Sequence, residues 1–164
     1  MQKPASHVHA IFDMPMPTIS VAHAARIQKE IRQAGAVRYN LWLPEARSLA
    51  RIIGVNEHIL GIVFGRYKKT PNNGMLVGRG ALVVTNERVL LVDKKPLFLR
   101  FDEISFGVIS AVVFTKAGPA GTVTLYSKIG TIQVRTFNQQ CALSFIRAIE
   151  KIIVQRQAKI ISEP

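Results

Sequence analysis

Basic side chains around two turns are the residues of this sequence best suited to chemistry. Three of them end one apolar run, one lies in the next run, and a pair follows a third run. They are Arg66, Lys68, Lys69, Arg79, Lys94 and Lys95. Arginine and lysine donate charge-assisted hydrogen bonds to phosphate and carboxylate oxygens. If the two turns meet at one end of the fold, these residues predict a binding site for an anionic ligand.

The sequence offers little for metal binding or nucleophilic chemistry. His7 and His9 lie two positions apart, but no cysteine or acidic cluster joins them, and a tetrahedral metal site needs more ligands. Cys141 is the only cysteine, so an intramolecular disulfide is excluded. Its place on an apolar helix face predicts a small core residue rather than a nucleophile. We therefore expect neither a bound metal nor another cofactor.

No group of residues predicts catalysis. The segment GRG at residues 78–80 lacks the lysine and the strand-to-helix context of a phosphate-binding loop. Asp102 and Glu103 are adjacent, and adjacent side chains point apart on an extended segment, so we expect two solvated turn acids. No Ser/His/Asp or Cys/His grouping is present that a fold would bring together. The sequence therefore predicts a protein that is not an enzyme.

Seven short apolar runs, separated by turn residues, predict β-strands. The clearest pair is a hairpin within residues 74–95, in which two runs rich in β-branched residues flank the polar turn TNER at residues 85–88. The strands are expected at residues 59–69, 75–85, 88–93, 97–101, 107–116, 122–127 and 131–136. Short strands at this spacing indicate an antiparallel sandwich or barrel rather than alternating β–α units.

Two segments before the strands have helical periodicity instead. Residues 18–34 follow a capping residue, Thr18 or Ser20, and Gly35 is a natural stop. A second helix is expected within residues 39–53, with Leu43 and Pro44 at its entry because proline is favoured in the first turn of a helix. We expect the first helix to pack within the protein or to bind a partner.

A long amphipathic helix is expected to end the fold. Asn138 is a suitable N-cap, and the helix continues to about residue 155, with Cys141 and Phe145 on its apolar face. One such helix after seven strands would close the open end of an antiparallel barrel. The fold class is therefore mainly β (α+β).

The hairpin at residues 74–95 resembles the central hairpin of bacterial pleckstrin-homology (PH)-like domains, in which a hydrophobic–TN–[KE]–R–hydrophobic segment recurs. Residues 56–59 (NEHI) resemble the segment that leads into the first strand of that family, and residues 101–104 (FDEI) resemble its acidic segment after strand four. The resemblance covers about residues 56–155. It implies a seven-stranded antiparallel PH-like barrel capped by a C-terminal helix, here preceded by an N-terminal helical segment.

The resemblance also bears on the basic residues. In PH folds the loops after strands one and three open at the same end of the barrel, where family members bind phosphorylated headgroups. The eukaryotic motif has a lysine at the end of strand one, followed by K/R-x-R on strand two. Lys68 or Lys69 fits the lysine and Arg79 fits one basic position, but Val77 and Ala81 on either side of Arg79 leave the motif incomplete.

Four segments are expected along the chain. They are an extended or disordered arm at residues 1–17, a helical segment at 18–55, the PH-like barrel with its helix at 56–158, and a tail at 159–164. No apolar run is long enough to span a bilayer, and no secretory signal is present. We expect a cytoplasmic location, with peripheral attachment to the inner face of the membrane as an alternative.

Three functions agree with these features. The first is a non-catalytic interaction module that binds a protein partner or a second copy of itself. The second is peripheral binding to anionic membrane lipid or phosphorylated headgroups through the six basic residues. The third is non-specific nucleic-acid binding, which the net charge of +12 favours. No aromatic residues alternate with the basic ones, which places nucleic acid last.

Overall fold

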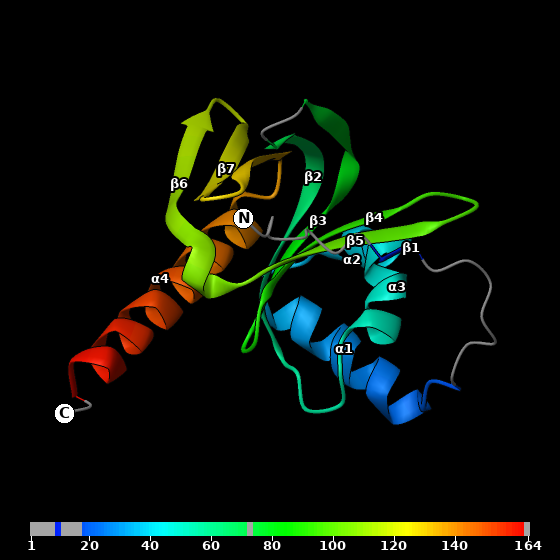
Figure 1. Cartoon of the computed structure of the whole chain (residues 1–164). Helices are drawn as coiled ribbons and strands as arrows, with labels where there is room; N and C mark the ends of the chain where they lie inside the picture. The colour runs from blue at the N-terminus through cyan, green and yellow to red at the C-terminus, as the bar shows by residue number, and fades with distance from the viewer. Residues whose placement is uncertain (1–8, 11–17, 72–73, 163–164) are drawn as a thin grey trace.

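The computed structural model describes residues 9–10, 18–71 and 74–162, and in them the chain forms a sheet, four α-helices and a short 3-10 helix (Figure 1). The strands are β1 (His9–Ala10), β2 (Ile59–Pro71), β3 (Leu76–Thr85), β4 (Val89–Lys94), β5 (Leu99–Ile104), β6 (Ile109–Ala117), β7 (Ala120–Ser127) and β8 (Gly130–Thr136). The helices are α1 (Val21–Gln33), α2 (Arg38–Leu41), α3 (Pro44–Ile52), the 3-10 helix (Phe106–Val108) and α4 (Gln139–Ser162).

The strand order in the sheet is β1-β5-β4-β3-β2-β8-β7-β6, and all pairs are antiparallel. The seven predicted strands are confirmed as an open antiparallel barrel, to which β1 adds a short edge strand on β5. The first half of β2 pairs with β3 alone, whereas its second half pairs with both β3 and β8. The second half of β2 therefore lies where the two halves of the barrel meet.

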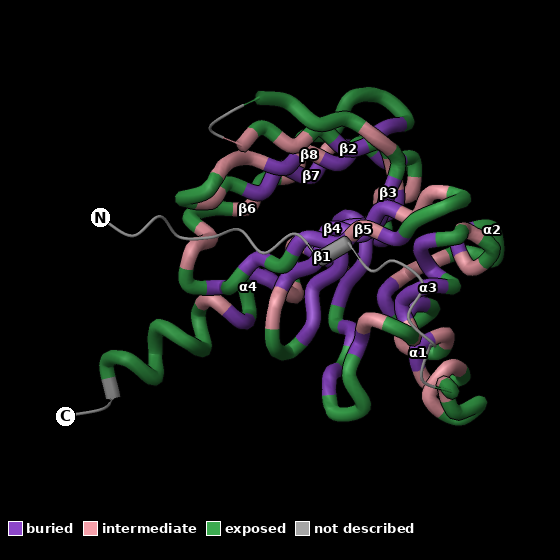
Figure 2. Tube along the Cα trace, turned by 45° about the vertical axis from the view of Figure 1, so that its right-hand side comes forward, coloured by how far each residue is buried: buried purple, intermediate pink, exposed green. Residues whose placement is uncertain are grey.

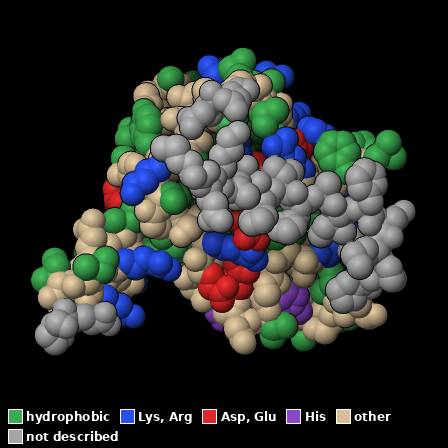
Figure 3. All heavy atoms as spheres, viewed as in Figure 1, with side chains coloured by type: hydrophobic (Ala, Val, Ile, Leu, Met, Phe, Trp, Pro, Cys, Tyr) green, Lys and Arg blue, Asp and Glu red, His purple; other side chains and the backbone are tan. Residues whose placement is uncertain are grey.

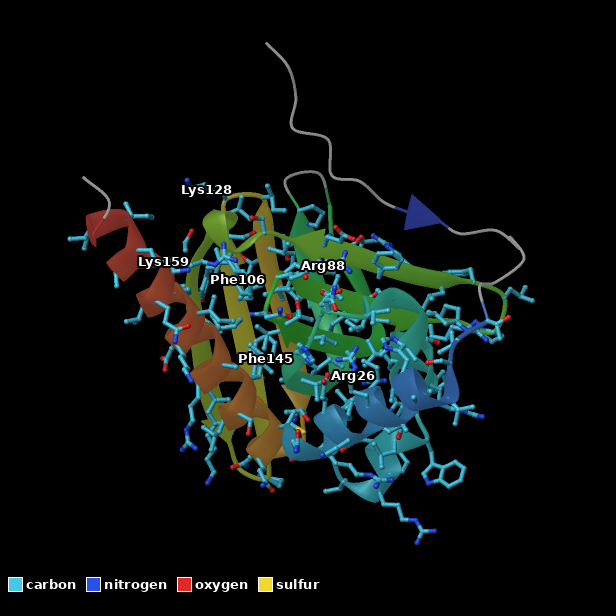
Figure 4. The ribbon with its side chains drawn as sticks, turned by 90° about the horizontal axis from the view of Figure 1, so that it is seen from below. Arg26, Arg88, Phe106, Lys128, Phe145 and Lys159 are labelled. Carbon is cyan, nitrogen blue, oxygen red and sulfur yellow. The ribbon has the colours of Figure 1, made fainter. Side chains whose placement is uncertain are left out.

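The C-terminal helix α4 closes this barrel, as predicted. Asn138 caps it, because the amide of Cys141 donates to Asn138 Oδ1 over 3.1 Å. Phe145 is fully buried and extends from α4 toward the strands (Figure 4). Gly61 on β2 permits this contact, since a Cβ there would lie 2.8 Å from the Cα of Phe145. The last turns of α4 extend past the barrel and are exposed (Figure 2).

A second apolar core lies on the outer face of the sheet, where α1 and α3 cover it. Ile27 and Ile31 of α1 and Leu49 of α3 pack with Ile62 and Phe64 of β2. Ser20 caps α1, because its Oγ accepts a hydrogen bond from the amide of His23. After the C-cap residue Ala34, the chain turns at Gly35, which has a φ of +97° that most other residues avoid. The helical N-terminal segment thus packs on the strands.

The observed elements differ from the predictions at several boundaries. Helix α3 begins at Pro44 with Leu43 as its N-cap, as expected, but the residues before it form a separate short helix, α2, that was not predicted. The fourth strand was expected at residues 97–101 but occupies Leu99–Ile104. The expectation of solvated turn acids is wrong for Asp102, which lies inside this strand and is buried.

The residues that resembled the PH-like pattern hold the hairpin to the segment before β2. The buried carboxylate of Glu57 accepts two hydrogen bonds of 2.9 Å from Arg88 and one of 2.8 Å from Thr85 Oγ1. It also accepts a hydrogen bond from the amide of Gly54. Burial alone would raise the pKa of Glu57, but these hydrogen bonds outweigh it and hold the pKa below its usual value.

Candidate anion-binding site

Three arginines stand side by side on three neighbouring strands. Arg66 on β2 is paired directly with Arg79 on β3 and, on its other side, with Arg135 on β8. Residues directly opposite each other in an antiparallel sheet share a face, and their Cβ atoms lie about 5 Å apart. We call Arg66, Arg79 and Arg135 the arginine row.

The arginine row lies on the outer face of the sheet, two residues beyond the apolar core under α1 and α3. Phe64 belongs to that core, and side chains on a strand alternate between faces, so Arg66 shares the face of Phe64. The three arginines are exposed, and within residues 18–71 and 74–162 none of them forms an ion pair. Like charges in directly opposite positions repel each other. The row is therefore a concentrated positive charge without a counter-ion in the described structure.

Backbone contact brings the strands together at the row. Gly65 precedes Arg66, and a Cβ at this position would overlap the carbonyl group of Arg135. Only glycine allows β8 to approach β2 so closely here. Gly65 thus permits the close approach of the two strands, and the neighbouring Arg66 places a positive charge on the outer face.

The predicted lysines are divided between different environments. Lys68 is exposed on the same face as Arg66 and forms no ion pair among the described residues. Lys94 is half-buried and donates to the carbonyl of Lys95 over 2.6 Å. Lys95 Nζ lies 3.1 Å from Asp93 Oδ1. Lys68 is therefore available to a ligand, whereas Lys94 and Lys95 already have partners within the chain.

Lys69 points to the opposite face of the sheet from the row. Its Nζ lies 2.7 Å from Oδ2 of the buried Asp102 on β5, which Arg100 also approaches to 3.5 Å. This pairing explains why Asp102 is not a solvated turn acid: it neutralises a lysine that is itself mostly buried. The structure thus separates Lys69 from Arg66 and Arg79.

A buried phenol lies beside Lys69 on the inner face. Tyr67 donates to Asp93 Oδ2 over 2.6 Å. Burial, and then the bond to Asp93, raise the pKa of Tyr67 far above its usual value, so the phenol keeps its proton. Tyr67 and Asp93 therefore act as structural links between β2 and β4.

A groove of about 980 Å³ lies over the arginine row. All three arginines line it, together with Lys94, Lys95 and Glu45, and α2 and the start of α3 border it. Burial raises the pKa of Glu45 above its usual value, although the charges of Lys95 and Arg79 act in the opposite direction. Among the described groove residues Glu45 is the acidic side chain, whereas five are basic, so the groove carries an excess of positive charge.

Basic side chains are spread over the surface and are not confined to the arginine row. Lys and Arg side chains occur at several separate places on the face shown in Figure 3, next to a small group of acidic side chains.

The sequence identified Arg66 and Arg79 but not Arg135. The available signal was the period-2 pattern of the last strand, in which Arg135 is exposed between buried Val134 and Thr136. Its position opposite Arg66 follows from the strand register alone.

The structure does not assemble a metal site in the part it describes. Among those residues, no group of three or more His, Cys, Asp and Glu side chains could hold an ion. His23 and His58 lie in a network with Arg26 and Glu30, and His7 lies outside the described residues. Cys141 is buried, which raises the pKa of its thiol to about 11. No helix in the described structure is both long and apolar enough to cross a bilayer.

Comparisons with known proteins agree with the PH-like fold. A family model described as a bacterial PH domain matches residues 53–151. No curated protein matches the chain. Similar solved structures include the Vps36 N-terminal PH domain, at 14% identity and a TM-score of 0.48, with 68% of this chain and 86% of that chain covered.

Two further structures are similar at lower TM-scores. A DUF1696 family protein with a pleckstrin-homology domain from Shewanella loihica PV-4 is 18% identical, with a TM-score of 0.43 and coverage of 66% and 89%. The DH/PH fragment of PDZRhoGEF, solved with human RhoA, is 11% identical, with a TM-score of 0.43. That match covers 82% of this chain but 39% of the other.

Proposed function

Since this chain belongs to the bacterial PH domain family, we propose that it is a non-catalytic interaction module and that the arginine row binds an anionic partner. The observation that carries the proposal is the direct pairing of Arg66 with both Arg79 and Arg135. Without a bound anion the three adjacent arginines repel one another, and an anion bound between them would offset that repulsion. Planar guanidinium groups also match phosphate and carboxylate oxygens in pairs of parallel hydrogen bonds.

Thermal unfolding with inorganic pyrophosphate at low ionic strength tests this function. A ligand that binds the native state raises the free energy of unfolding and therefore the melting temperature. At a ligand concentration one hundred times its Kd, the free energy of unfolding increases by about 2.7 kcal/mol. We expect pyrophosphate to raise the melting temperature of the wild type and to have little effect on an Arg66→Gln/Arg79→Gln variant. Added salt should weaken the effect, because surface electrostatics are screened.

The matched control removes the same charge elsewhere. Lys116 on β6 and Arg147 on α4 are exposed and do not line the groove. The Lys116→Gln/Arg147→Gln variant should respond to pyrophosphate as the wild type does. If both double variants lose the response equally, the binding is a property of the net charge, and the arginine row is not the site.

Exposed apolar side chains in the turn between β4 and β5 favour a second candidate, peripheral binding to an anionic membrane. Leu97 is 95% and Phe98 is 50% exposed, and Pro96 separates them from Lys94 and Lys95. Apolar side chains flanked by lysines suit the boundary between headgroups and acyl chains. This function would combine a cytoplasmic location with attachment to the inner face of the membrane.

Flotation with phosphatidylcholine vesicles, with and without phosphatidylserine, tests this second candidate. Membrane binding predicts flotation with the anionic vesicles at low salt and a clear loss in a Leu97→Ser/Phe98→Ser variant. A protein that responds to pyrophosphate but stays in solution with both vesicle types would leave the arginine row as an anion site and remove the membrane as its partner.

A further inference from the structure

The groove over the arginine row has an apolar wall as well as a basic floor. Val37 and Tyr39 line it from the segment that contains α2, and Phe137 lines it from the residue after β8. These side chains are 54%, 65% and 75% exposed, respectively. The groove therefore places exposed apolar surface next to three arginines that form no ion pair in the described structure.

Much of this wall comes from outside the part of the chain that matches the family model. The match begins at residue 53, whereas α2 and α3 end at Leu41 and Ile52. In Figure 1 both helices lie beside the sheet. The groove is thus formed by the outer face of the barrel together with a helical segment that precedes the matched residues.

Internal hydrogen bonds hold the wall in place. Asn138 Nδ2 donates to Gly35 O and to Asn40 Oδ1, and Asn40 Oδ1 also accepts from the amide of Val37. These amides are occupied by partners within the chain. The charged side chains of the groove are the three arginines, Lys94, Lys95 and Glu45, and the exposed apolar side chains form its wall.

We propose that this groove binds an acidic peptide segment of a protein partner. The carboxylates of the peptide pair with Arg66, Arg79 and Arg135, and an apolar side chain of the peptide packs against Tyr39 and Phe137. This inference rests on the proposed function of the arginine row and names the partner class. Charge complementarity with the arginines favours acidic residues in the peptide, and the exposed apolar wall favours one apolar residue in it.

The geometry favours a peptide held by its side chains. At the floor of the groove β2 is hydrogen-bonded to β3 on one side and to β8 on the other, so it has no free edge for strand addition. The volume of about 980 Å³ is at the upper end of the range for ligand pockets, which suits several side chains. A flat membrane surface fits a concave groove less well than a peptide does.

Fluorescence polarisation with two labelled heptapeptides tests the proposal. One peptide carries four carboxylates around a central phenylalanine, and the other has serine in place of the phenylalanine. The wild type should bind the phenylalanine peptide about tenfold more tightly than the serine peptide. The reason is that a buried aromatic side chain contributes a large part of the binding free energy, which serine cannot replace. A Tyr39→Ser/Phe137→Ser variant should lose this preference and keep its response to pyrophosphate.

Two further double variants serve as controls for the peptide experiment. The Arg66→Gln/Arg79→Gln variant should bind neither peptide, whereas a Val154→Ser/Ile161→Ser variant, which removes exposed apolar surface from α4, should behave as the wild type. Equal affinity of the wild type for the two peptides, with an intact pyrophosphate response, would overturn the peptide proposal and leave the anion site standing. Absence of a pyrophosphate response in the wild type would refute the function on which the peptide proposal rests. Equal affinity of the wild type for the two peptides, together with flotation on phosphatidylserine vesicles that is lost in Tyr39→Ser/Phe137→Ser, would make a membrane the occupant instead.

Discussion

Asn138 Nδ2 lies 3.2 Å from Asn40 Oδ1, and this hydrogen bond joins the N-terminus of α4 to α2. The same side chain donates to Gly35 O and, through Oδ1, accepts from the amide of Cys141. One amide therefore caps the last helix and holds the turn between the first two. The closure of the barrel and the wall of the groove depend on the same residue.

Replacement of Asn138 with Ala should lower stability and also weaken binding in the groove. Loss of the helix cap costs about 1–2 kcal/mol, and the lost hydrogen bonds to Gly35 and Asn40 add to it. Urea denaturation measures the change. Asn138→Ser is the control, because serine is also a good N-cap and removes the Nδ2 donor without adding a charge. If Asn138→Ser and Asn138→Ala are equally unstable, the cap contributes little.

Replacement of Arg66 with Gln should stabilise the protein in the absence of ligand. Directly opposed like charges destabilise a sheet by about 0.2–1 kcal/mol, and Arg66 faces an arginine on both sides. The gain should be largest at low salt and should shrink as salt screens the charges. The exposed Arg147 on α4 supplies the control, Arg147→Gln. An Arg66→Gln protein that is less stable than the wild type in low-salt urea denaturation would contradict the predicted repulsion.

Acid should destabilise the protein through Glu57. Its folded-state pKa is lower than the usual value of 4.5, so between the two values the unfolded chain binds more protons. The stability that Glu57 contributes is therefore complete above pH 4.5 and is lost as the pH falls through the folded-state pKa. Glu30 has a lowered pKa as well and acts in the same direction.

The Glu57→Gln variant isolates this contribution. It should be less stable than the wild type near neutral pH, because Arg88 loses a buried carboxylate partner. Its stability should also fall less steeply from pH 5 downward, because one shifted carboxyl group is absent. Urea denaturation across this pH range measures both effects. Parallel pH profiles for the two proteins would refute the assignment to Glu57.

Replacement of Gly61 with Ala should destabilise the contact between β2 and α4. The new Cβ would lie 2.8 Å from the Cα of Phe145 and 2.9 Å from Val84 Cγ1, so the helix would have to move. Overpacking of this kind costs about 1–3 kcal/mol. Gly107→Ala is the matched control, because its nearest neighbour, Ser105 Oγ, lies 3.8 Å away. Equal melting temperatures for Gly61→Ala and the wild type would show that α4 adjusts freely.

Much of the fold could be predicted because its signals are local. Alternation with period 2, turn residues and the N-caps at Ser20 and Asn138 each act within a few residues, and together they indicated seven strands followed by a helix. The start of α3 at Pro44 was visible in the sequence too, but the short α2 before it was not predicted. Local signals identify elements more reliably than their ends.

The six predicted basic residues show where local signals stop. Their types and approximate places were evident, but a strand turns every second side chain to the opposite face, so Lys68 and Lys69 have different surroundings. Arg135 went unnoticed because it comes from a distant part of the chain and meets Arg66 only through the pairing of β8 with β2. The same long-range pairing placed Asp102 next to Lys69 and buried it.

By itself, the sequence determined the strands, the capping helix, the PH-like pattern and the excess of positive charge, because each depends on residue type and short-range spacing. The tertiary structure decided which charges gather and which are neutralised. Register across β8, β2 and β3 formed the arginine row, and the packing of α2 and α3 on the sheet formed the groove above it. Both depend on contacts between segments far apart in the chain, whose geometry no local pattern specifies.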